Sequence, residues 1–122
     1  MRIYIRVSIV LYQIHSFLAH MYVKQLSLPG IRNRVAIVNG AASGIGRGIC
    51  LSLFEQGADV VCVDLKSAEE NANETLRILK EARPSGKCTF IACDVLDRSQ
   101  IEVKLAEVAS LWDHTSANMI CY

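Results

Sequence analysis

The stretch that decides the fold is Val35-Ala-Ile-Val-Asn-Gly-Ala-Ala-Ser-Gly-Ile-Gly-Arg-Gly48. Its apolar start predicts a buried strand, and the helical spacing of the apolar residues that follow predicts a helix ending at Gly57. Three glycines, Gly40, Gly44 and Gly46, separate the two elements. A strand, a glycine turn and a helix together offer free backbone N–H groups and a helix N-terminus to a phosphate.

The spacing of these glycines restricts the ligand. A P-loop requires Lys and then Ser or Thr after its last glycine, and Gly46 is followed by Arg47 and Gly48. Gly40 lets the chain leave the strand in a tight turn. Gly44 and Gly46 remove side chains where backbone approaches a pyrophosphate and where helix packs on strand. The alternative is a glycine-rich turn without a ligand.

The rest of the chain repeats the alternation of strand and helix. Apolar runs at residues 60–63 and 88–93 predict two more strands, and residues 117–122 resemble the start of a fourth. Ser67-Ala-Glu-Glu70 predicts a capping box that opens a second helix, and Asp97-Arg-Ser-Gln100 predicts the cap of a third. The order βαβαβαβ predicts an α/β fold with a doubly wound parallel sheet.

Acidic residues follow the second and third strands. Asp64 occupies the position that faces the adenosine ribose in a dinucleotide fold, where a carboxylate binds the 2′-OH and repels a 2′-phosphate. Neither Leu65 nor Ser43 offers a cation, so NAD is favoured over NADP. Asp94, with the backbone of Val95, is placed to bind the adenine amino group. A helix or turn cap is the alternative for Asp64, and a simple turn residue is the alternative for Asp94.

Residues 1–33 differ from the rest. The sequence has no Asp or Glu before Glu55, and residues 7–23 are mostly apolar with polar interruptions. Three interpretations stay open: a targeting or non-native leader, a membrane-surface helix within residues 1–24, and an additional packed helix. We therefore divide the chain into residues 1–33, a leader or helical extension, and residues 34–122, a partial NAD(P)-binding domain.

Composition supports one globular domain. The 122 residues are 52% hydrophobic and 20% charged, and the net charge of +1 gives no electrostatic case for nucleic acid. The five cysteines are odd in number and none are spaced as C-x-x-C, which argues against a disulfide framework or a metal site. We expect a reducing compartment, either cytoplasmic or mitochondrial, with membrane association through residues 1–24 as the alternative.

Asn39-Gly-Ala-Ala-Ser-Gly-Ile-Gly46, Asp64 and Cys93-Asp-Val95 resemble the N-terminal half of a short-chain dehydrogenase/reductase. Within that family, the run Glu74-Thr-Leu-Arg-Ile-Leu and the ending Thr115-Ser-Ala-Asn-Met-Ile-Cys look most like the estradiol 17-beta-dehydrogenase type 8 and 3-oxoacyl-ACP reductase branch. The resemblance implies an incomplete Rossmann-like sheet and an NAD cofactor. The implied cofactor-binding residues are Gly40, Ala42, Ser43, Gly44, Ile45, Gly46, Asp64, Leu65, Asp94 and Val95.

The residues that perform catalysis in this family are not found in the sequence. The family pattern places Asn-Asn-Ala-Gly after the fourth strand, then a catalytic Ser and a Tyr-x-x-x-Lys pair, whose Tyr donates a proton to the carbonyl oxygen. None of the four tyrosines here is followed by Lys at that spacing. We therefore expect NAD binding without turnover, and a carbonyl or alcohol substrate only for a complete chain. The alternative is a non-catalytic dinucleotide-binding or protein-interaction module, with an oligomer as one form.

Overall fold

The computed structural model describes residues 30–111 and 119–121. Of residues 1–33, interpreted above as leader, membrane-surface helix or packed helix, only residues 30–33 lie in this range, and those interpretations stay predictions. In the described part, four strands alternate with three α-helices and one short 3₁₀ helix. In chain order these are β1 (Val35–Asn39), α2 (Gly44–Glu55), β2 (Asp59–Asp64), η2 (Lys66–Ala68), α3 (Glu69–Ala82), β3 (Cys88–Ala92), α4 (Arg98–Leu111) and β4 (Met119–Cys121).

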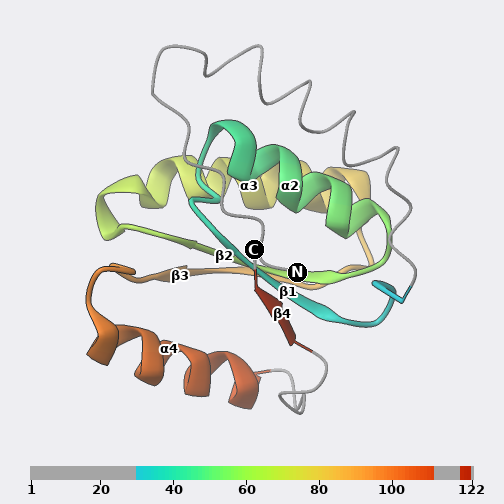
Figure 1. Cartoon of the computed structure of the whole chain (residues 1–122). Coiled ribbons are helices and arrows are strands. Elements are labelled where there is room, and N and C mark those ends of the chain that lie inside the picture. The colour runs from blue at the N-terminus through green and yellow to red at the C-terminus, as the bar shows by residue number, and fades with distance from the viewer. Residues whose placement is uncertain (1–29, 112–118, 122) are drawn as a thin grey trace.

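The four strands form one parallel sheet in the order β3-β2-β1-β4. The chain builds outward from β1 to β3 and then crosses back, so that β4 pairs with the other side of β1. Helices α2 and α3 cover one face of the sheet and α4 covers the other (Figure 1). This arrangement confirms the predicted Rossmann-like, doubly wound parallel sheet, in which ligands bind beyond the carboxyl ends of the strands where the order reverses.

The apolar runs of β1 and β2 are continuous because both of their faces are covered. Ala36 and Val38 of β1 belong to the core beneath α2 and α3, whereas Val35 and Ile37 belong to the core beneath α4. Strand β2 divides its side chains in the same way, and Val60 to Cys62 are fully buried. The alternation of side chains along a strand thus feeds two separate cores from one sheet.

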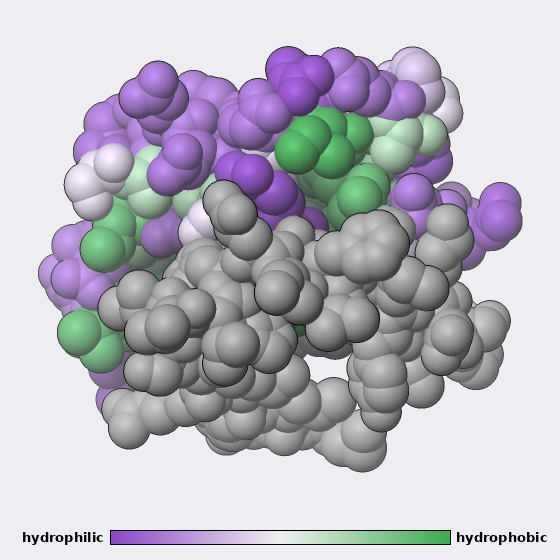
Figure 2. Space-filling view, turned by 90° about the horizontal axis from the view of Figure 1, so that it is seen from above, coloured by the Kyte–Doolittle hydropathy of each residue, from purple (hydrophilic) through white to green (hydrophobic). Residues whose placement is uncertain are grey.

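The two cores are unequal. The core beneath α2 and α3 contains Leu53, Phe54 and Leu79, each with no exposed surface. On the opposite face, Val108 is the buried anchor of α4, and Ile101 packs beside it only partly buried. Viewed from the α2 and α3 side, the described surface is mainly hydrophilic (Figure 2), in keeping with the exposed charged residues along α3. No helix in the described ranges combines the length and apolarity that crossing a membrane requires.

The starts of the second and third predicted helices differ in outcome. The predicted capping box at residues 67–70 is wrong: α3 begins at Glu69 with Ala68 as its N-cap, and no side chain caps it. The reason is a tight turn in which the Ala68 amide donates to the Leu65 carbonyl at 2.9 Å, so that η2 leads directly into α3. The cap at Asp97 is confirmed, because its Oδ1 accepts the amide of Ser99 at 3.1 Å.

Candidate functional site

The turn between β1 and α2 requires residues without a side chain at three positions. Gly40 and Gly44 have φ angles of +72° and +58°, in the left-handed region that favours glycine. At position 46, a Cβ atom would lie 1.9 Å from the carbonyl oxygen of Gly40, which is closer than any side chain allows. The amides of Gly40 and Ala41 donate to the Val63 carbonyl at 2.9 and 3.2 Å. The turn is therefore fixed to the end of β2.

The N-terminus of α2 carries no cap of its own. Ser43 occupies the N-cap position, but its side chain makes no capping hydrogen bond, and the first turn contains no acidic residue. The Arg47 amide makes a helical bond to the Ser43 carbonyl at 3.3 Å, so the amides of Gly44, Ile45 and Gly46 precede the helical ladder. These donors and the positive end of the helix dipole suit an anion placed above the turn.

Asp64 joins the end of β2 to this turn. Its Oδ2 accepts the Ala42 amide at 3.0 Å, and its Oδ1 accepts the amide of Leu65 at 2.8 Å. The carboxylate is half-buried, and the Leu65 side chain beside it is 49% exposed. Because a carboxylate has about four lone-pair sites, these two bonds leave acceptor capacity for a further ligand. The sequence-predicted turn and Asp64 therefore lie together in one site.

Two further residues of this site were not identified from the sequence. Arg47 donates from Nη2 to the Ala42 carbonyl at 2.6 Å and to the Asn71 carbonyl at 2.9 Å, and from Nε to Thr75 Oγ1 at 2.9 Å. Thr75, which is fully buried on α3, donates its hydroxyl to the Ala41 carbonyl at 2.9 Å. A signal was available: Arg47 is the one charged residue between Val35 and Phe54, and Thr75 interrupts the apolar face of α3.

Asp94 and Val95 lie at the same edge of the sheet. The Cys93 amide donates to the Asp64 carbonyl at 2.9 Å, which brings the end of β3 against the end of β2. Asp94 Oδ1 accepts the Leu96 amide at 3.0 Å, so this side chain stabilises its own turn. Val95 is 42% exposed. The turn alternative for Asp94 is thus confirmed, and an adenine contact stays a prediction.

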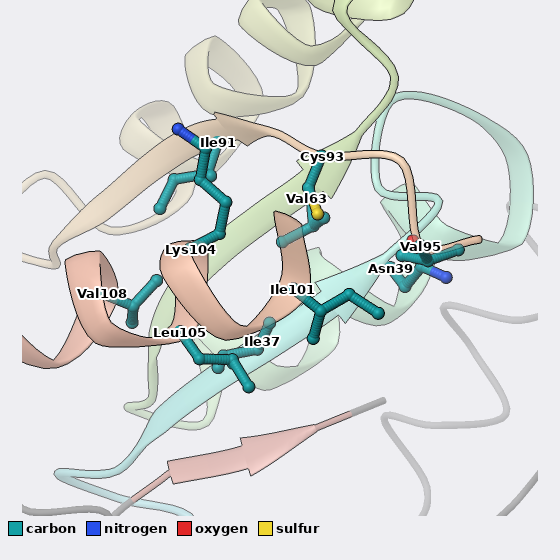
Figure 3. Close-up of a pocket in the computed structure, with 10 residues that line it drawn as sticks. All are labelled: Ile37, Asn39, Val63, Ile91, Cys93, Val95, Ile101, Lys104, Leu105 and Val108. Atoms are coloured by element: carbon teal, nitrogen blue, oxygen red, sulfur yellow. The ribbon is translucent and has the colours of Figure 1, made fainter. Parts of the chain in front are cut away.

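An apolar cavity of about 160 Å³ lies on the opposite face of the sheet, between α4 and the strands (Figure 3). Its walls are mainly aliphatic, and the lining residues that carry an amide, a thiol or an ammonium group are Asn39, Cys93 and Lys104. The Lys104 ammonium is held by the Glu107 carboxylate at 2.9 Å. Within the described ranges, no cluster of His, Cys, Asp or Glu side chains is placed to bind a metal ion. The groups suited to a polar ligand are therefore those of the glycine turn.

Three similarities to known proteins fit this geometry. The L-2,3-butanediol dehydrogenase of Corynebacterium glutamicum is 38% identical over 77 residues, covering 63% of this chain and 29% of that protein. Human 15-hydroxyprostaglandin dehydrogenase [NAD(+)] is 38% identical over 71 residues, covering 58% of this chain and 26% of the other. The crystal structure of levodione reductase superposes with a TM-score of 0.62 at 25% identity, covering 68% of this chain and 31% of that one.

The chain therefore spans less than a third of the length of these relatives. Their names differ in substrate, and the resemblance to the estradiol 17-beta-dehydrogenase type 8 and 3-oxoacyl-ACP reductase branch stays a prediction. The family itself is established over a longer stretch, because the family model described as short chain dehydrogenase matches residues 34–116. That range runs from the start of β1 through α4, and it includes the glycine turn and Asp64. This protein belongs to the short-chain dehydrogenase family.

Proposed function

We propose that this chain binds NAD at the turn between β1 and α2, as the cofactor-binding portion of an oxidoreductase. The observation that carries the proposal is the bond between Asp64 and the Ala42 amide, beside an uncapped helix N-terminus. It places a carboxylate for ribose hydroxyls next to backbone donors for a pyrophosphate. The residues fit such a ligand, since Gly40 leaves open space above the turn where a Cβ would meet no atom within 4 Å.

A preference for NAD over NADP follows from the charges around Asp64. A 2′-phosphate on the ribose would face the carboxylate, and the neighbouring Leu65 has no charge to compensate it. The guanidinium of Arg47 is engaged with the carbonyls of Ala42 and Asn71. For the adenine, we propose contacts from the remaining lone pairs of Asp94 and from the backbone of Val95, which lie at the same edge of the sheet.

The chemistry that bound NAD supplies is hydride transfer between a carbonyl and an alcohol. This chain's part in it is to hold and orient the adenosine and pyrophosphate portions of the cofactor. Protonation of a carbonyl oxygen requires an acid at the substrate, and the sequence contains no Tyr-x-x-x-Lys pair to provide one. We therefore propose that the 122-residue chain binds the cofactor without turning over a substrate.

Titration of the full chain with NADH and NADPH, followed by ligand fluorescence, tests this proposal. The wild-type chain should bind NADH at least tenfold more tightly than NADPH. Asp64→Ser should weaken NADH binding and reduce the difference between the affinities for NADH and NADPH. Glu81→Gln is the matched control, because Glu81 lies on the exposed side of α3 and, among the residues that the structure describes, pairs with Arg77. Equal affinity for both cofactors would remove the NAD preference, and binding of neither would remove the function.

The absence of turnover has its own assay. Carbonyl reduction by the chain with saturating NADH should not exceed the rate without protein. A rate well above that background, lost in Gly46→Ala, would overturn the proposal of a non-catalytic chain while leaving cofactor binding intact.

A protein-interaction module is the second candidate, and one observation favours it. The cavity between α4 and the sheet is apolar, its lining residue Leu105 is 37% exposed, and Val103 on the same helix is 65% exposed. In the described part of the sheet, β4 pairs only with β1. Size-exclusion chromatography with light scattering distinguishes the candidates: a discrete dimer or heteromer supports this one, and a monomer that binds NADH counts against it.

A further inference from the structure

We infer that Arg47 and Thr75 are positioning residues of the proposed dinucleotide site, acting on the ligand through the two peptide groups of Ala42. The inference rests on the proposed function and extends it to residues that do not themselves touch the cofactor. Four hydrogen bonds carry it, and they join three elements distant in sequence: the glycine turn, the end of β2 and the middle of α3.

The first peptide group, between Ala41 and Ala42, is held at both ends. Its carbonyl accepts the Thr75 hydroxyl at 2.9 Å, and its N–H donates to Asp64 Oδ2 at 3.0 Å. The hydroxyl, the peptide and the carboxylate thus form one continuous chain of hydrogen bonds, in which each bond polarises the next. Thr75 therefore fixes the orientation of the carboxylate proposed to bind the ribose, although it lies on a different element.

Within the described residues, the second peptide group, between Ala42 and Ser43, is held at its carbonyl, mainly by Arg47, since Thr75 Oγ1 lies 3.4 Å from the same oxygen. Arg47 Nη2 donates to its carbonyl at 2.6 Å, a short bond of the charge-assisted kind. This peptide is trans, since the described chain has no cis bond, and in a trans peptide the carbonyl and N–H point in opposite directions. By holding the Ala42 carbonyl against α2 and α3, Arg47 directs the Ser43 N–H away from them. In the proposed site, this N–H is a further donor to the pyrophosphate, beside the amides at the start of α2.

Arg47 can hold this position because its own side chain is fixed. Its Nε donates to the buried Thr75 hydroxyl and its Nη2 also donates to the Asn71 carbonyl on α3. A flexible ammonium would satisfy one acceptor, whereas the planar fork of a guanidinium satisfies several in a fixed geometry. Donor preorganisation of this kind lowers the ordering cost that binding must otherwise meet.

Amide NMR titration of the full chain with adenosine and with ADP tests the inference, because only ADP carries a pyrophosphate. In the wild-type chain, ADP should shift the Ser43 amide resonance and adenosine should not. Arg47→Met should weaken ADP about tenfold, reduce the Ser43 shift and leave the adenosine affinity within twofold. Arg47→Lys should recover part of the ADP affinity. Thr75→Val should weaken adenosine and ADP together, about fivefold, while Thr75→Ser restores both.

Arg77→Met is the matched control, since Arg77 is an exposed guanidinium on α3 whose partners in the described part of the chain are Glu74 and Glu81. It should bind both ligands like the wild type. Equal losses of adenosine and ADP in Arg47→Met, or an unchanged Ser43 shift, would overturn the positioning role and indicate a purely structural one. If Arg47→Met does not fold, Arg47→Lys and Thr75→Ser test the positioning role through their affinities for adenosine and ADP. A wild-type chain that binds neither ligand would overturn the proposed function as well, which separates the two failures.

Discussion

Helices α2 and α4 both begin a few residues beyond a strand of the same sheet, yet their N-termini are built in opposite ways. At α4, Asp97 accepts the Ser99 amide and hydroxyl, and Asp94 accepts the Leu96 amide, so the turn satisfies itself. At α2, the N-cap side chain of Ser43 makes no such bond, and the first turn of the helix contains no acidic residue. The donors at the start of α4 are thus satisfied within its own turn, whereas the donors at the start of α2 are those that we propose to bind a ligand.

The bonds that do exist at α2 surround its donors rather than consume them. The peptide groups of residues 41 and 42, which precede the helical amides, are hydrogen-bonded to Asp64, Arg47 and Thr75. The turn is thus held in place by hydrogen bonds while the amides at the start of α2 lack a capping acceptor, and local capping at α4 does not give this combination. Four changes test this difference between the two helix starts.

The largest effect is expected from Gly46→Ala. The new Cβ would overlap the Gly40 carbonyl, so the turn must open, with a loss of about 3 kcal/mol in the free energy of unfolding and of NADH binding. Chemical denaturation and NADH titration measure both. Gly40→Ala is the matched control for stability alone, because nothing lies near its Cβ and only the positive φ opposes it, at about 1 kcal/mol. Equal losses of unfolding free energy in the two variants would contradict the steric clash at position 46.

Ser43→Asp would make α2 resemble α4. Ser43 has φ −160° and ψ 172°, the extended conformation of an N-cap, so a carboxylate there should accept an α2 amide and raise the free energy of unfolding by about 0.5 kcal/mol. The same charge should repel the pyrophosphate and weaken NADH at least tenfold. Thermal melts and titrations follow the two quantities. An increase in stability without loss of affinity would mean that these donors do not serve the ligand.

Raising the pH tests the side of α2 that packs on the sheet, where Cys50 contacts Cys62 of β2. Cys50 and Cys62 are fully buried with their Sγ atoms 3.8 Å apart, and the pKa of Cys50 lies well above its ordinary value of 9.0 because of the hydrogen bond to Cys62 and burial. The unfolded chain therefore loses this proton first, so stability present below pH 9 should be lost as the pH rises above it. Denaturation at pH 8 and 10 shows this, and Cys50→Val should reduce the loss.

The smallest effect is expected from Asp97→Ala. Hydrogen bonds from Ser99 and Gln100 hold the pKa of Asp97 below its usual range, and the variant should lower the stability of α4 modestly. In the wild type, this contribution is present above the ordinary carboxyl pKa and is lost as the pH falls below it. Amide hydrogen exchange across α4 reports the change. NADH affinity should not move, and a parallel loss of affinity would show that the two helix starts are coupled.

The sequence predicts the sheet well because its signals are local. The apolar runs at 35–38 and 60–63 are continuous, as is typical of strands covered on both faces. Gly40 marks the turn, because glycine adopts the positive φ that the backbone has there. The doubly wound order follows from the alternation of elements, since right-handed crossovers leave few other topologies. The pairing of Asp64 with the turn also follows, because the ends of adjacent parallel strands meet at one edge.

What the sequence could not show depends on contacts between distant residues. Thr75 meets Ala41 across 34 positions, and nothing in α3 alone distinguishes that hydroxyl from an incidental one. The capping pattern at 67–70 failed for a different reason: the same residues also suit a 3₁₀ turn, and the structure closes that turn by the bond from the Ala68 amide to the Leu65 carbonyl. For Asp94, the sequence left two roles open, and only the geometry of its turn favours one.

The bond between Asp64 and the Ala42 amide has a consequence for how such a site could change its cofactor. The side chain that we propose to discriminate against a 2′-phosphate is also the acceptor for a backbone donor at the centre of the turn. Replacing it to admit NADP would remove that acceptor and loosen the proposed pyrophosphate site at the same time. On this proposal, a switch of cofactor in this chain needs a second substitution that restores an acceptor, and the single change alone gives a weaker binder of both cofactors.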